Sequence, residues 1–96
     1  MITRVNEFRA NEGSAEELRE LLGSFVPVIA GSSGCRFCRL LQGRDDPSRL
    51  LVIEEWDSVE SHQSSVTEIP PAALERAMEL LAGPPTGAYF TDRTEG

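Results

Sequence analysis

The chain has 96 residues, of which 40% are hydrophobic and 26% are charged, a composition typical of one soluble globular domain over residues 1–96. The net charge of −7 would repel a phosphate backbone, so we expect neither nucleic acid nor a membrane as a partner. No apolar run approaches the ~20 residues that cross a bilayer, and no secretory signal is visible. We therefore expect a cytoplasmic protein.

The first part of the chain predicts a strand followed by a helix. Residues 2–8 alternate between two faces and contain β-prone side chains, which indicates a strand. Ser14 and Glu17 then form a capping-box pattern before a stripe of apolar residues at helical spacing. Pro27 lacks a backbone N–H, so we expect the helix to kink or end there.

The rest of the chain predicts three strands and a divided helical region. The apolar run at residues 51–53 indicates burial on both faces, which is typical of a central strand or of one covered by a second subunit. The expected elements are strands over 35–41, 50–56 and 88–92, and helices over 57–67 and 72–82.

The order β-α-β-β-α-β predicts an α+β protein with a ferredoxin-like fold. In this fold a four-stranded antiparallel sheet carries its helices on one face. The other face of the sheet would leave apolar residues in water. Because a short chain buries only about two-thirds of its unfolded surface, we expect a homodimer whose two sheets pack face to face.

Two cysteines and one histidine limit the chemistry of the chain. Cys35 and Cys38 have a spacing known from redox and metal pairs. Residues three positions apart along a regular strand, however, point to opposite faces of the sheet. No second cysteine pair completes a zinc site. We therefore expect two separate thiols and no metal.

His62 and Asn6 each allow two interpretations. His62 falls on the apolar face of its predicted helix, so it is either a packed core histidine or a base beside a ligand cavity. Asparagine is disfavoured within strands. Asn6 therefore marks either an edge strand or a polar group directed into a cavity.

Glu54 and Trp56 share one face of the strongest predicted strand. Trp56 ends this strand and is expected in the core. A carboxylate on the same face needs a partner if it is buried. We expect Arg36 or Arg39, on the neighbouring strand, to pair with Glu54.

Four stretches of the chain are typical of one family. They are FRANEGSAEEL (8–18), GCRFCRL (34–40), DDP (45–47) and EEWDSVESH (54–62). In these stretches the chain resembles the antibiotic biosynthesis monooxygenase family. The resemblance implies a dimeric α+β barrel with a ligand cavity between the sheet and the helices of each subunit.

The resemblance implies oxidation of a small hydroxylated aromatic, quinol or polyketide by dioxygen without a cofactor. Such a reaction needs a dry cavity, a proton acceptor and hydrogen-bond donors for the substrate anion. We assign catalytic roles to Asn6 as a donor, Trp56 as a wall and indole donor, and His62 as the proton acceptor. Further substrate contacts are expected from Phe8, Phe25, Cys38 and Glu54.

Other members of the family act differently, which leaves alternatives open. Haem-degrading relatives combine an asparagine like Asn6 with a tryptophan at the position of Ser65 and a later histidine, and neither of the last two is present. A non-catalytic dimer that binds a small molecule, or a polyketide cyclase or isomerase, would use the same cavity.

Overall fold

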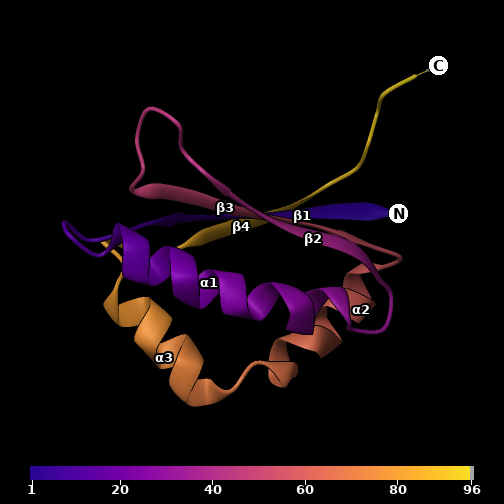
Figure 1. Cartoon of the computed structure of the whole chain (residues 1–96). Helices are drawn as coiled ribbons and strands as arrows, with labels where there is room; N and C mark the ends of the chain where they lie inside the picture. The colour runs from indigo at the N-terminus through magenta and orange to yellow at the C-terminus, as the bar shows by residue number, and fades with distance from the viewer. Residues whose placement is uncertain (96) are drawn as a thin grey trace.

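The computed structural model describes residues 1–95 and follows the predicted order of elements, with the second helical region in three pieces (Figure 1). No helix in this range is long and apolar enough to cross a membrane. The elements are β1 (Ile2–Arg9), α1 (Ala15–Ala30), β2 (Cys35–Gln42), β3 (Arg49–Trp56), α2 (Val59–Ser65), the 3₁₀-helix η1 (Val66–Glu68), α3 (Pro71–Glu79) and β4 (Thr86–Phe90).

The four strands form one antiparallel sheet in the order β2-β3-β1-β4. The helices cover one face of this sheet and leave the other open (Figure 1). This arrangement confirms the ferredoxin-like α+β prediction. It also places β3 at the centre, as its apolar run at 51–53 predicted.

The core lies between α1, α3 and the covered face of the sheet. Even-numbered residues of β3 face the helices, and all four are buried. Helix α1 presents its apolar stripe to them because residues spaced by three and four share one side of a helix. The buried apolar residues of the core are Ala10, Leu18, Leu22, Phe25, Leu50, Ala77 and Leu80.

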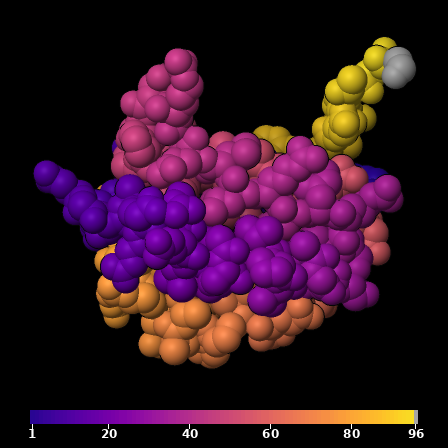
Figure 2. All heavy atoms as spheres, in the orientation of Figure 1, coloured from indigo at the N-terminus to yellow at the C-terminus, as the bar shows by residue number. Residues whose placement is uncertain are grey.

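The open face of the sheet also carries apolar side chains. Direct pairing places Leu41 opposite Leu51, Val5 opposite Ile53, and Phe90 opposite a threonine of β1. Leu41 is 45% exposed and Phe90 is 54% exposed. The β2–β3 loop and the C-terminal segment both project beyond this face (Figure 2). An apolar sheet face between two projecting segments is suited to a partner.

Some local predictions about the helices were wrong. Helix α1 does not end at Pro27, one of the two alternatives that the sequence predicted, but continues to Ala30. A proline removes only one backbone hydrogen bond from the helix. This loss is outweighed because the buried stripe of the helix packs against the sheet along its whole length. Ser14 stands at the N-cap, but its side chain makes no capping hydrogen bond. The last helix ends at Glu79, earlier than predicted, and β4 begins at Thr86.

A β-bulge in β2 overturns the prediction that the two cysteines face opposite sides. The register shifts between Cys35 and Phe37, so that Cys35 pairs with Trp56 and Cys38 pairs with Glu54. Directly paired residues lie on the same face of a sheet. Both thiols therefore lie on the helix-covered face, because the extra residue of the bulge resets the alternation.

Candidate active site

A cavity of about 210 Å³ lies between the covered face of the sheet and the helices. One end is polar, where Arg4, Asn6, Glu54 and His62 meet. The remainder is mainly apolar. The other lining residues are Phe8, Leu22, Phe25, Ile29, Val52, Ser65, Val66, Ile69, Leu74, Ala77 and Met78.

Glu54 is the central group of the polar end and is only 3% exposed. The indole N–H of Trp56 donates to its Oε1 at 2.8 Å, and the amide of Asn6 donates to its Oε2 at 2.8 Å. Burial raises the pKa of Glu54, whereas these two hydrogen bonds and the charge of Arg4 act in the opposite direction. The carboxyl group is thus held in place by donors on both oxygens.

The prediction that Arg36 or Arg39 pairs with Glu54 was wrong. Arg36 pairs with Glu55 instead, with 3.2 Å between Nε and Oε1, and Arg39 lies over the ring of Phe37. Both arginines belong to the open face, because Phe37 pairs with Glu55 and the buried Glu54 points the other way.

Asn6 links Glu54 to Arg4. Its Nδ2 donates to Glu54 and also to the carbonyl of Val52 at 3.3 Å, so both amide hydrogens have acceptors. Its Oδ1 accepts a hydrogen bond from Arg4 Nε at 3.0 Å. β1 is a central strand, so the structure favours the interpretation of Asn6 as a polar group directed into a cavity over that of an edge position.

His62 projects from α2 to the polar end. Ser58 is the N-cap of helix α2, and its side chain accepts a hydrogen bond from the backbone N–H of Ser61. His62 Nδ1 lies 2.6 Å from the hydroxyl of Tyr89, and its Nε2 lies 3.9 Å from Glu54 Oε1. Burial, followed by the charge of Arg4, lowers the pKa of His62. The imidazole is therefore neutral near pH 7, and in this neutral form it can accept a proton.

Aromatic contacts fix the orientation of this imidazole. Its ring packs edge to face against Trp56, with ring centroids 5.5 Å apart, and against Tyr89, at 5.4 Å. Trp56 itself is fully buried. Because the indole N–H donates to Glu54, Trp56 acts on the cavity through that carboxyl group.

The structure brings most of the predicted site residues together. Asn6, Glu54, His62, Phe8 and Phe25 line the cavity. Trp56 lies behind Glu54 and His62.

Cys38 lies opposite Glu54 but is not among the residues that line the cavity. Burial, followed by the nearby carboxyl of Glu54 and the thiol of Cys35, raises the pKa of Cys38 to about 12. Its thiol is therefore protonated and a weak nucleophile. Among residues 1–95, no three histidine, cysteine, aspartate or glutamate side chains are grouped to hold a metal ion.

Sequence reasoning missed Arg4 and Tyr89. Arg4 could have been found from its spacing, because it lies two residues before Asn6 and so on the same strand face. Tyr89 could not, since only the pairing of β4 with β1 places it opposite Arg4.

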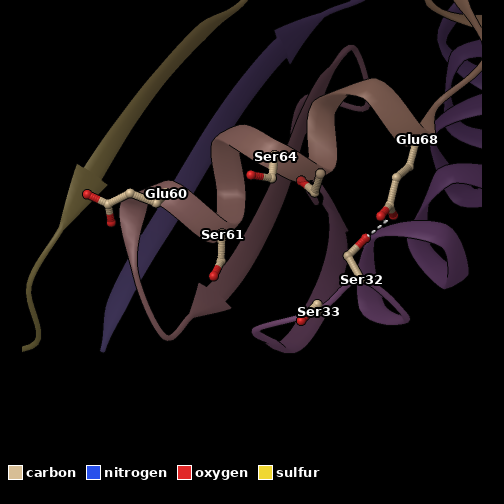
Figure 3. A pocket seen from close by; sticks show the side chains of 7 residues that line it. Ser32, Ser33, Glu60, Ser61, Ser64 and Glu68 are labelled. Carbon is tan, nitrogen blue, oxygen red and sulfur yellow. Dashed lines mark hydrogen bonds between the residues drawn. The ribbon is translucent and has the colours of Figure 1, made fainter.

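A second hollow, of about 330 Å³, lies outside this cavity between the end of α1, α2 and η1 (Figure 3). Its lining consists of serines and two glutamates. Ser32 donates a hydrogen bond to Glu68 Oε2 at 2.5 Å (Figure 3). It contains neither an imidazole nor a cation, so the first cavity is the better candidate for acid–base chemistry. The lining residues are Ser32, Ser33, Glu60, Ser61, Ser64, Ser65 and Glu68.

The fold and the cavity define a ferredoxin-like α+β protein with a cavity between its sheet and its helices. The family model described as "Antibiotic biosynthesis monooxygenase" matches residues 1–68. The chain belongs to this family.

Solved structures show the same fold at low sequence identity. A putative antibiotic biosynthesis monooxygenase from Nitrosomonas europaea has 15% identity and a TM-score of 0.86, covering 98% of this chain and all of that one. Rv0793 from Mycobacterium tuberculosis has 20% identity and a TM-score of 0.83, covering 98% and 96%. SnoaB, a cofactor-independent oxygenase from Streptomyces nogalater, has 20% identity and a TM-score of 0.80, covering 98% and 94%. No curated protein matches the chain.

Proposed function

We propose that the protein is a cofactor-independent monooxygenase that oxidises a small hydroxylated aromatic, a quinol or a polyketide with dioxygen. The observation that carries this proposal is a neutral imidazole beside a buried carboxyl group at the end of an apolar cavity. Family membership and the likeness to SnoaB support it.

His62 acts as the proton acceptor in this proposal. With the Nδ1–H of His62 donating to the hydroxyl oxygen of Tyr89, Nε2 carries no proton and accepts a hydrogen bond from a substrate hydroxyl in the cavity. Transfer of its proton to Nε2 gives an imidazolium beside the carboxyl group. The lowered pKa of His62 lets the imidazolium return this proton later in the reaction.

Asn6 and Trp56 then serve as positioning residues. Both donate to Glu54, so they hold the carboxyl group that faces His62. A carboxyl group held 3.9 Å from Nε2 favours the imidazolium that forms when His62 takes the proton.

The apolar walls promote the electron transfer that follows. A deprotonated electron-rich ring can give an electron to dioxygen, and the two radicals can combine to form a carbon–oxygen bond. Water would stabilise the ground-state anion and so oppose this step. Phe8 and Phe25 line the part of the cavity where the ring would lie.

We also propose that the active form is a homodimer joined through the open sheet face. This face carries apolar residues from all four strands, and Phe90 is largely exposed in the single chain. Replacing the half-buried Ile53 of this face with arginine should give a monomer in sedimentation equilibrium. Gln63→Arg, at an exposed position on α2, is the control.

Oxygen uptake with a panel of quinols and anthrones tests the function. We expect consumption of dioxygen by the wild type, and loss of at least tenfold in kcat for His62→Ala, in line with the 10²–10⁴-fold typical of general bases. Partial rescue by added imidazole would separate loss of the base from loss of structure. Gln63→Ala should behave as the wild type.

Two outcomes would contradict the proposal and indicate a different function. Ligand binding without oxygen uptake by any substrate would indicate a non-catalytic binding protein. Turnover that continues without dioxygen would indicate a cyclase or isomerase.

A further inference from the structure

We propose that Arg4 makes this cavity a site for an anionic aromatic ligand, a single ring with an acidic group such as a carboxylate. This inference rests on the proposed function for the aromatic part of the ligand and adds the charge and size of the substrate. It comes from the placement of one arginine that the proposed oxidation does not use.

The structure holds the Arg4 guanidinium at the polar end in three ways. Its Nε donates to Asn6 Oδ1 at 3.0 Å, and its Cζ lies 4.7 Å from the ring centroid of Tyr89. In the third, Gly87, which pairs with Asn6 across the sheet, leaves the space that the guanidinium occupies. A Cβ atom at Gly87 would meet Arg4 Nη2 and lie 2.7 Å from Cζ, so a larger residue there would displace the guanidinium from this position.

Arg4 lacks the partner that most arginines of this chain have. All nine basic residues are arginines, and six of them form an ion pair with a carboxylate in the structure. Within residues 1–95, no carboxylate pairs with Arg4, although it lines the cavity. A guanidinium is always charged and carries five N–H donors, so a half-buried one favours an anion as its acceptor.

Glu54 does not cancel this preference. It is the one carboxylate among the described lining residues, and each of its oxygens already accepts an N–H from another residue. A cationic ligand would have to compete with these donors and approach Arg4. Of the two charged groups that line the cavity, Arg4 is therefore the one with unused hydrogen-bonding capacity for a ligand.

The volume of the cavity matches the size of a one-ring ligand. An apolar cavity of about 150 Å³ accommodates benzene, and drug-sized ligands occupy pockets of roughly 300–1,000 Å³. By proportion, 210 Å³ holds about eight or nine non-hydrogen atoms. A hydroxylated benzoate is close to this size, whereas part of a three-ring polyketide would extend outside the cavity. Exposed Val66 and Met78 border the cavity, where a substituent could extend outward.

Calorimetric measurement of the binding of two analogues with the same shape tests the charge preference. The probes are 4-hydroxybenzoate and 4-hydroxybenzamide, which have the same outline but differ in charge. We expect the wild type to bind the acid at least tenfold more tightly, as a charge-assisted hydrogen bond of about 1.5–3 kcal/mol implies. Arg4→Gln should abolish this difference. Gly87→Ala, which keeps the charge but displaces the guanidinium, should reduce it.

Arg19→Gln is the matched control, because it removes the same charge from an arginine of α1 whose side chain is 42% exposed and which lines neither the cavity nor the open sheet face. Equal binding of acid and amide by the wild type would overturn the inference, as would unchanged discrimination in Arg4→Gln or failure to bind either probe. Discrimination that depends on Arg4, without oxygen uptake by any substrate, would refute the oxygenase and leave the anion site in place.

Discussion

Replacing Glu54 with glutamine tests whether this buried carboxyl group organises the polar end of the cavity. The side chain keeps its size, but one oxygen becomes an amide nitrogen. Both oxygens of a carboxyl group keep lone pairs, whether ionised or protonated, and an amide nitrogen has none to accept with. The amide nitrogen must therefore face an N–H donor, either that of Trp56 or that of Asn6.

The cost follows from the loss of one buried hydrogen bond. Leaving a buried donor without an acceptor costs about 1–3 kcal/mol. Removing a group whose charged form is disfavoured by burial offsets part of this, so we expect Glu54→Gln to lower the free energy of unfolding by about 1–2 kcal/mol. Glu55→Gln, on the opposite face of the same strand with a 31% exposed side chain, should cost less than about 0.5 kcal/mol.

Urea unfolding followed by the fluorescence of Trp56, the single tryptophan, measures both variants. Because burial raises the pKa of Glu54, the folded chain binds this proton more tightly than the unfolded chain does. The contribution of Glu54 to stability therefore falls as the pH rises above its ordinary pKa of 4.5, and the cost of Glu54→Gln should be larger at pH 5 than at pH 8. Equal stability of the two variants at both pH values would refute the reasoning.

Three further predictions concern other parts of the chain. The proton NMR signal of His62, the single imidazole, should titrate with a midpoint below 6.5, and Arg4→Gln should raise this midpoint; a midpoint above 6.5 in the wild type would contradict the role of burial. Cys38 should resist alkylation by iodoacetamide at pH 8 in the folded protein because its pKa is raised to about 12, as mass spectrometry of a digest can show; rapid labelling would count against this. Gly34→Ala should destabilise the fold by more than Gly13→Ala, since both residues have positive φ but only at Gly34 would the new Cβ meet other atoms, the nearest at 2.6 Å; equal melting temperatures would disprove the clash.

The fold was largely predictable because its elements repeat simple patterns. The alternation in β1 and the apolar run in β3 assigned each face of the sheet, and pairing then followed from the order of the elements. The bulge after Cys35 was not predictable, since no single residue marks an extra position in a strand. The same holds for Pro27, where tertiary packing decides whether the helix continues.

The candidate site was predictable only in part, for a physical reason. Asn6, Glu54 and His62 are unusual for their positions, and polar residues in apolar surroundings can be recognised in one sequence. Their partners are ordinary residues in ordinary places. Tyr89 is a common strand residue, and its contact with His62 joins segments 27 positions apart. The partners depend on strand pairing and not on residue type.

The hydrogen bonds of the polar end indicate which groups a ligand meets. The side-chain N–H groups of Asn6 and Trp56 donate to Glu54 and to the backbone. The hydroxyl of Tyr89 is hydrogen-bonded to His62 Nδ1. Two groups that line the cavity keep capacity for a ligand: the outer nitrogens of Arg4 and the Nε2 atom of His62. An arginine binds an anion, and the unprotonated nitrogen of a neutral imidazole accepts a hydrogen bond from a hydroxyl group. A ring that carries both an acidic group and a hydroxyl satisfies them together, so removal of either substituent should weaken binding, and removal of the hydroxyl alone should abolish oxidation.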